Sequence, residues 1–228
     1  MSLFAIADLH LSLGSDKPMD VFSGWENYVR RLEQNWRSLV SDDDTVAVAG
    51  DISWAMTLER TAEDFAFLDA LPGRKLLFKG NHDYWWSTRR KMETFFEQKG
   101  FSTLHIVHNS AEEVGEFAVC GTRGWFFDAE EDADHKVLLR EAGRLRASIE
   151  AAERTGKEPV VFLHYPPVFG DASCPELLNI LREKGIRRCY FGHIHGPSAR
   201  KAPIRQIDGM TLRLISCDAL RFSPILVR

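Results

Sequence analysis

Short apolar runs alternate with longer segments of helical periodicity through most of this chain. Three of the runs, 3–7, 45–49 and 75–79, have the length and composition of strands that are buried on both faces. From Trp25 to Val40, apolar side chains recur at the i, i+3, i+4 and i+7 positions of an amphipathic helix. Strands that alternate with helices in this way predict an α/β layered fold.

The rest of the chain continues the alternation. At 228 residues, with 44% hydrophobic and 27% charged residues, we expect a single domain, 1–228, with a substantial buried core. The turn residues Asp208-Gly209 are typical of a hairpin, so the tail is expected to form hairpin strands at 204–215 and 224–227. Further helices are expected at 57–71, 85–99, 133–154 and 175–183, and further strands at 103–107, 117–121, 160–163 and 188–191.

Polar residues follow five of the predicted strands. Ligands of α/β folds bind outside the carboxyl ends of the strands, so we expect these side chains to converge. In an extended segment, His193 and His195 would point to one face, with their α-carbons about 7 Å apart. The five groups are Asp8 with His10; Asp51; Asn81 with His82 and Asp83; His164; and His193 with His195.

The types of side chain in these groups indicate a metal site. The seven oxygen and nitrogen donors exceed what one first-row ion uses, and they suit two ions about 3.5–4 Å apart that share a carboxylate. No thiolate is among them, which favours a catalytic site over a structural zinc site. The four cysteines are scattered without a C-x-x-C spacing, so we expect reduced thiols in a cytoplasmic protein. The seven donors are Asp8, His10, Asp51, Asn81, His164, His193 and His195.

The order of these motifs, Asp8-x-His10, Gly50-Asp51, Gly80-Asn81-His82-Asp83, His164 and Gly192-His193-x-His195, resembles the signature of the calcineurin-like metallophosphoesterase superfamily. The resemblance implies a four-layer α/β/β/α sandwich of two mixed β-sheets flanked by helices. It implies two divalent or trivalent ions, with manganese and iron favoured and zinc or cobalt as alternatives. It also implies that Asp8, His10 and His195 bind the first ion, that Asn81, His164 and His193 bind the second, and that Asp51 bridges them.

Such a site would hydrolyse a phosphate ester through attack by a hydroxide that bridges the two ions. The leaving alkoxide then needs a proton, and His82 is the candidate acid because its neighbour Asn81 is a predicted ligand. Asp83 is expected to orient the His82 ring. The alternative is that His82 only donates hydrogen bonds from outside the ligand set.

The expected substrate is a small phosphomonoester or nucleotide. A phosphodiesterase or nuclease is the alternative reaction, and a non-catalytic metal-holding interaction module is the alternative class. The net charge of −4 gives no reason to expect nucleic acid, and the one compact basic run, 89–91, is explained by a solvated helix face. Lys79 and Asp83 replace the arginine and glutamate of the serine/threonine protein phosphatase motif, which argues against a phosphoprotein.

Other features leave two interpretations open. Arg123, on a glycine-flanked loop, is either a phosphate clamp or a surface arginine. The aromatic residues at 54, 84–86 and 125–127 either form an apolar wall beside the ligands or anchor their loops in the core. The acidic run 128–134 is expected to be a surface loop leading into a helix. The apolar run at the amino terminus is short and has no basic leader, so we expect no signal peptide. No apolar stretch is long enough to predict a membrane span.

Overall fold

Two β-sheets packed face to face form the centre of the molecule in the computed structural model, which describes residues 1–125, 132–202 and 204–228. The first sheet has the order β13-β1-β2-β3-β4, and the second has the order β11-β12-β10-β7-β6-β5. Within the first sheet, β1 to β4 are parallel and β13 is antiparallel. In the second sheet, β12, β10, β7 and β6 are parallel, while the edge strands β11 and β5 are antiparallel. The predicted pair of mixed sheets is therefore confirmed.

The strands of the first sheet are β1 (Leu3–Ile6), β2 (Thr45–Val48), β3 (Arg74–Leu77), β4 (Leu104–Ile106) and β13 (Ile225–Leu226). Those of the second are β5 (Ala111–Val114), β6 (Phe117–Thr122), β7 (Glu158–Leu163), β10 (Arg188–Phe191), β11 (Arg205–Ile207) and β12 (Met210–Leu214). A small hairpin comprises β8 (Val168–Phe169) and β9 (Ala172–Ser173). The α-helices are α1 (Tyr28–Leu39), α2 (Ala62–Asp69), α3 (Arg89–Lys99), α4 (Asp132–Glu153) and α5 (Pro175–Glu183), and short 3₁₀ helices cover Leu58–Thr61 and Gly196–Lys201.

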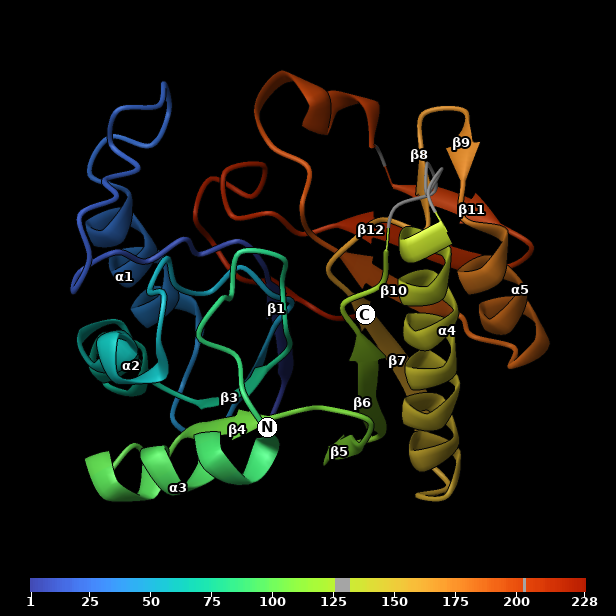
Figure 1. Cartoon of the computed structure of the whole chain (residues 1–228), viewed down its shortest axis with the longest axis horizontal. Coiled ribbons are helices and arrows are strands. Elements are labelled where there is room, and N and C mark those ends of the chain that lie inside the picture. Colours follow the sequence, from blue (N-terminus) through green and yellow to red (C-terminus); the bar gives the residue numbers. More distant parts are fainter. Residues whose placement is uncertain (126–131, 203) are drawn as a thin grey trace.

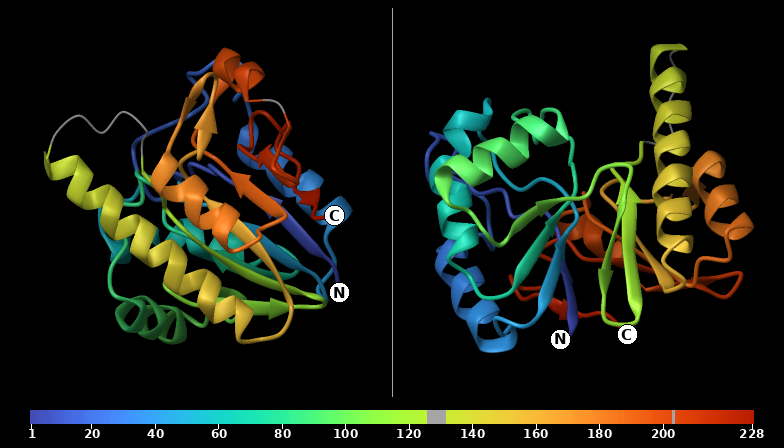
Figure 2. Two further views of the ribbon diagram at one scale, coloured as in Figure 1. Left: turned by 90° about the vertical axis from the view of Figure 1, so that its right-hand side faces the viewer. Right: turned by 90° about the horizontal axis from the view of Figure 1, so that it is seen from below.

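The helices cover the outer faces of the two sheets. Helices α1, α2 and α3 lie against the first sheet, and α4 and α5 lie against the second (Figures 1 and 2). The alternation along β1 shows how one strand serves two layers: Leu3 and Ala5 face the other sheet, whereas Phe4 and Ile6 face the helices. Between the sheets, the ring of Phe162 stacks on Phe78 and Tyr190 at centroid distances of 5.6 and 5.4 Å. Three apolar cores therefore separate four layers, as the family resemblance implies.

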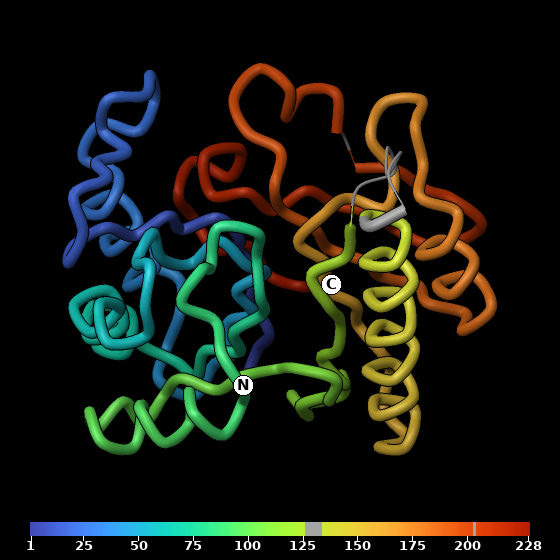
Figure 3. The backbone as a smooth tube through the Cα atoms, viewed as in Figure 1, coloured from blue at the N-terminus to red at the C-terminus, as the bar shows by residue number. Residues whose placement is uncertain are grey.

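The carboxyl-terminal strand differs from the prediction. Strand β13 does not extend the hairpin of β11 and β12; it pairs antiparallel with β1, with Phe4 opposite Leu226. The two termini therefore lie near each other (Figure 3). The reason is that residues 215–224 leave the second sheet, and Cys217 donates its N–H to the carbonyl of Ala7 at 2.9 Å.

The structure also differs from the prediction in where two helices begin and in one additional strand. Helix α1 begins at Tyr28, and α3 begins at Arg89, after Thr88, whose hydroxyl accepts the N–H of Lys91. Strand β5 is absent from the prediction because its two adjacent glutamates interrupt the apolar pattern that marks a buried strand. Most of the acidic run, 128–131, lies outside the described residues. Among the residues that the structure describes, no helix combines the length and hydropathy that crossing a membrane requires.

Candidate metal centre

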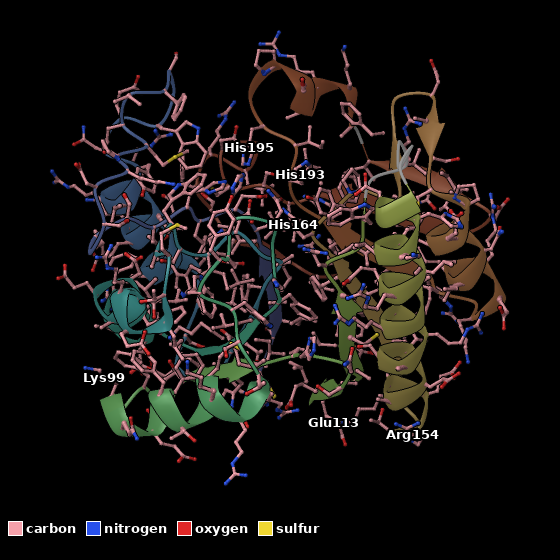
Figure 4. All side chains as sticks on the ribbon, in the orientation of Figure 1. Lys99, Glu113, Arg154, His164, His193 and His195 are labelled. Carbon is pink, nitrogen blue, oxygen red and sulfur yellow. The ribbon has the colours of Figure 1, made fainter. Side chains whose placement is uncertain are left out.

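The polar groups that follow β1, β2, β3, β7 and β10 converge at one end of the two sheets. A bridge between Ala7 and Ser216 joins the chain after β1 to the chain after β12, which brings the strand ends of both sheets together. His164, His193 and His195 lie close together in the loops at this end, on the opposite side from Glu113 and Arg154 (Figure 4). The prediction that these groups converge is therefore confirmed.

One set of donor atoms comes from Asp8, His10 and His195. Their ligand atoms all lie within 4.8 Å of one another. The Nε2 atom of His195 is 3.4 Å from Oδ1 of Asp8 and 3.4 Å from Nε2 of His10. Three such atoms around one point can hold a metal ion.

A second set surrounds the amide oxygen of Asn81. The Oδ1 atom of Asn81 lies 2.6 Å from Nε2 of His164 and 3.0 Å from Nδ1 of His193. The Nδ1 atom of His164 is 3.1 Å from the carbonyl oxygen of Ala49, which can only accept, so the ring proton is on Nδ1. In the neutral ring, the lone pair of Nε2 then faces the Asn81 oxygen, and these two acceptors suit a shared cation.

The carboxylate of Asp51 lies between the two sets. Its Oδ2 atom is 3.8 Å from Nε2 of His10 and 3.4 Å from Nε2 of His164. Its Oδ1 atom accepts the backbone N–H of His82 at 2.8 Å, which fixes the orientation of the group. One oxygen of Asp51 thus faces donors from both sets.

The backbone at these positions takes an uncommon conformation. Asp8, His10, Asp51 and His193 have φ values of 61°, 46°, 51° and 71°, in the left-handed region that non-glycine residues rarely adopt. The segment around His193 and His195 is therefore not extended, contrary to the sequence expectation. Such conformations cluster at functional sites, where surrounding contacts compensate for a cost of about 1–3 kcal/mol each.

Glycine allows the carboxylates to approach the neighbouring loops closely. A Cβ atom on Gly192 would lie 2.5 Å from Oδ2 of Asp8, and one on Gly80 would lie 2.1 Å from Oδ1 of Asp51. Both distances are too short for any other residue. In place of a side chain at 192, the Asp8 carboxylate accepts the N–H of His193 at 3.0 Å with either oxygen.

Burial keeps most of the imidazoles neutral. It lowers the pKa of His10 to about 3, and burial together with the neighbouring His164 lowers the pKa of His193 to about 3. Burial, followed by the charge of Asp8, raises the pKa of Asp51 to about 8. Neutral imidazoles offer nitrogen lone pairs and the crowded carboxylates offer negative charge, so the chemistry of this donor set fits metal ions.

Asp218 supports the site from outside and was not among the predicted residues. Its Oδ1 atom lies 2.9 Å from Nδ1 of His195, and its Oδ2 atom accepts the N–H of Gly196 at 2.8 Å. Although burial opposes it, Asp8 and Asp218 raise the pKa of His195 to about 10. The available signal was its place shortly after β12, which is one more parallel strand that ends at this edge of the sheets.

Asp83 is not placed to orient the His82 ring. It is 1% exposed, and its two oxygens accept five N–H groups, four of them from the backbone of the two neighbouring loops. The two residues share no hydrogen bond within the described part of the chain; the ring partner of His82 is the hydroxyl of Tyr84, 3.5 Å from Nδ1. The His82 ring instead packs against Trp54 at a centroid distance of 4.4 Å.

The aromatic residues and Arg123 have separate roles. Trp85 is buried and donates its indole N–H to Asp83 at 3.0 Å, so it anchors its loop, whereas Trp54 lies beside the histidines. The Arg123 guanidinium lies over Trp125 at 4.5 Å and 3.7 Å from the buried Glu141, while its carbonyl accepts the N–H of His164. Its role as a phosphate clamp stays a prediction. Residues 126–127 lie outside the described residues.

Comparison with known proteins gives the same assignment. The family model described as calcineurin-like phosphoesterase matches residues 1–197. The search of curated proteins gave no match. Among solved structures, a Thermus thermophilus protein is similar with a TM-score of 0.64 and 11% identity over 99% of this chain and 97% of that one.

Two further solved structures share the fold. A phosphopantetheinyl hydrolase from Mycobacterium tuberculosis gives a TM-score of 0.59 at 14% identity, and a protein of unknown function from Aquifex aeolicus gives 0.55 at 13%. Each comparison covers 99% of this chain and 95% of the other. The match over residues 1–197 shows that this chain belongs to the calcineurin-like phosphoesterase family.

Proposed function

We propose that this protein is a two-metal phosphoesterase that hydrolyses a small phosphomonoester or nucleotide. The observation that carries the proposal is the position of Asp51, whose Oδ2 atom faces His10 of one donor set and His164 of the other. A carboxylate between two sets of donors is the arrangement that two ions about 3.5–4 Å apart require. Metal-dependent hydrolysis itself is the general activity of the family that the chain matches.

Each residue of the two sets has a defined task in this proposal. Asp8, His10 and His195 would hold one ion; Asn81, His164 and His193 would hold the other; Asp51 would contact both. When bound, the two ions supply positive charge for the phosphate oxygens and lower the pKa of water toward neutrality. The oxygen and nitrogen donors suit manganese or iron, with zinc and cobalt as alternatives.

His82 is the proposed proton donor. Its backbone N–H is fixed by Asp51, and its ring is half-buried at the rim of the site, with a centroid 5.8 Å from that of His10. The Nδ1 atom is directed to the Tyr84 hydroxyl, so Nε2 is the atom that would carry the proton to the leaving oxygen. Asp83 serves the site indirectly, because it holds together the loops that carry Asp51 and His82.

The reaction is tested by reconstituting metal-stripped protein with Mn, Fe, Zn, Co or Mg and assaying each form. The substrates p-nitrophenyl phosphate and bis-p-nitrophenyl phosphate separate monoester from diester hydrolysis. Turnover of the monoester is expected to exceed that of the diester, and preference for the diester would support a phosphodiesterase instead. Absence of turnover with every ion would refute an enzyme of this class.

Two variants test the assigned residues. Asp51→Asn is expected to abolish turnover and lower the bound metal, because it removes the shared carboxylate charge. His82→Ala is expected to lower turnover by about 10²–10⁴-fold while the metal content stays unchanged. Loss of an ion from His82→Ala would contradict its role as an acid that binds no metal.

A further inference from the structure

An apolar groove opens directly beside the candidate metal centre. It has a volume of about 450 Å³, and its apolar walls come from Met19, Phe22, Trp25, Trp54 and Pro197. We propose that this groove binds the leaving alcohol of the substrate and that this alcohol carries a hydrocarbon group, either an alkyl chain or an aromatic ring. The inference rests on the proposed function and deepens it by naming the class of substrate.

The position of the groove identifies which part of the substrate it would hold. His10, His82 and His195 line its inner end, so a group in the groove is adjacent to the phosphate site. Trp54 forms part of this inner wall, with its ring 5.0 Å from that of His10 and 4.4 Å from that of His82. Because His82 is the proposed donor to the leaving oxygen, the groove lies on the leaving-group side of phosphorus.

The chemistry of the walls favours hydrocarbon over a sugar or a base. The indole N–H of Trp54 is directed to the sulfur of Met19 at 3.3 Å, and both oxygens of Asp218 are engaged by His195 and Gly196. A polyhydroxylated alcohol would therefore lose hydrogen bonds to water and find few partners in the groove. Aromatic faces, a thioether and a proline ring instead provide apolar contact area.

The outer rim also favours an apolar occupant. Phe22 is 56% exposed although it lies on the groove wall, and a large exposed aromatic ring beside an active site is typical of a ligand-binding surface. The ammonium of Lys17 lies over the Trp54 ring, 4.8 Å from its centroid. Lys17 is not one of the residues that line the groove, so the walls keep their apolar character.

The proposal is tested by lengthening an alkyl chain without changing the chemistry of the phosphate. Binding of methyl-, butyl- and octylphosphonate to the manganese-loaded protein is measured by calorimetry, below the concentration at which the chains aggregate. Each buried methylene strengthens binding by up to about fourfold. We expect octylphosphonate to bind at least tenfold more tightly than methylphosphonate. Equal binding of the two, or no binding of either, would refute the proposal that the groove binds a hydrocarbon group.

Phe22→Ser and Val21→Ser form a matched pair of variants. Val21 is 73% exposed and adjacent in sequence, but it does not line the groove. We expect Phe22→Ser to reduce the advantage of the octyl chain at least threefold and Val21→Ser to leave it unchanged. The same effect in both variants, or in neither, would show that the chain binds elsewhere on the protein.

Turnover of ethyl, butyl and octyl phosphate separates this inference from the proposed function. Their leaving alcohols have nearly equal acidity, so a rise in kcat/KM with chain length reports binding of the chain. Equal kcat/KM for all three would refute binding of the hydrocarbon group in the groove but would leave the proposed phosphoesterase activity supported. Chain-dependent phosphonate binding without any turnover would refute the proposed reaction and retain an apolar site. Preference for glucose 6-phosphate over cyclohexylmethyl phosphate would contradict the hydrocarbon specificity.

Discussion

Replacing Asp83 with asparagine is expected to destabilise the whole loop system beneath the metal centre. One carboxylate oxygen accepts the N–H groups of Asp51 and Gly80, and the other accepts those of Ile52, Ser53 and Trp85. An asparagine amide can offer only one acceptor oxygen, so its NH₂ group faces at least two N–H donors in either orientation. Each buried donor without an acceptor costs about 1–3 kcal/mol, which gives a loss of about 2–6 kcal/mol.

Urea denaturation followed by tryptophan fluorescence measures this loss as the change in the free energy of unfolding. Asp44→Asn is a matched control, because the Asp44 oxygens also accept hydrogen bonds from the backbone of Ser2 and from Ser41 but lie near the surface. Water can replace those bonds, so we expect a loss below about 1 kcal/mol. A similar loss in both variants would refute the argument. Reduced turnover of Asp83→Asn with unchanged stability would instead support the original expectation that Asp83 orients His82.

Three further predictions concern support of the site, a buried lysine and a close approach of strands. Asp218→Asn is expected to weaken manganese binding about 10–100-fold in calorimetric titration, since Asp218 orients His195; unchanged affinity would contradict this role. Burial lowers the pKa of Lys75 to about 8 from 10.5, so the unfolded chain binds more protons between these values and stability rises with pH there. Relative to Lys75→Met, wild-type protein should gain at most about 1.4 kcal/mol per pH unit from pH 8 to 10 in urea titrations, and a flat difference would refute the shift. Gly121→Ala would place a Cβ atom 1.8 Å from the Phe162 carbonyl oxygen and should prevent normal pairing of β6 with β7. Gly143→Ala, in an open position on α4, should instead stabilise by about 0.5–1 kcal/mol, and thermal unfolding distinguishes the two.

The sequence was sufficient to predict the strands that are buried on both faces. Strands β1 and β2 are buried on both faces, so each appears in the sequence as an unbroken apolar run. The end of the run also identifies the polar residue that follows the strand. Strand β5 was not predicted because its two adjacent glutamates, Glu112 and Glu113, interrupt the apolar pattern, although it pairs with β6 in a local hairpin. Residues 85–88 fitted the helical pattern of the sequence but lie before the helix. The Trp85 indole donates its N–H to Asp83, and Thr88 caps α3, which begins at Arg89.

The role of Asp83 could not have been predicted from its position next to His82. Its hydrogen-bond partners at 51–53 lie about thirty residues away in sequence and reach it only because β2 and β3 are parallel neighbours. Asp218 was missed for a related reason. It lies in the segment between the predicted hairpin strands 204–215 and 224–227, for which nothing was predicted, although the return of this segment to Ala7 is what joins the two sheets at the site.

The His193-Ile194-His195 segment shows why the local backbone matters to the proposed centre. Had this segment been extended, both rings would have faced one side and could have served one ion. The left-handed conformation of His193, with φ of 71°, instead directs its Nδ1 atom to Asn81, while His195 directs Nε2 to Asp8. Gly192 makes this turn possible by admitting the Asp8 carboxylate where a side chain would stand. A single short segment therefore contributes to both donor sets, and any change in its conformation would alter the spacing between them.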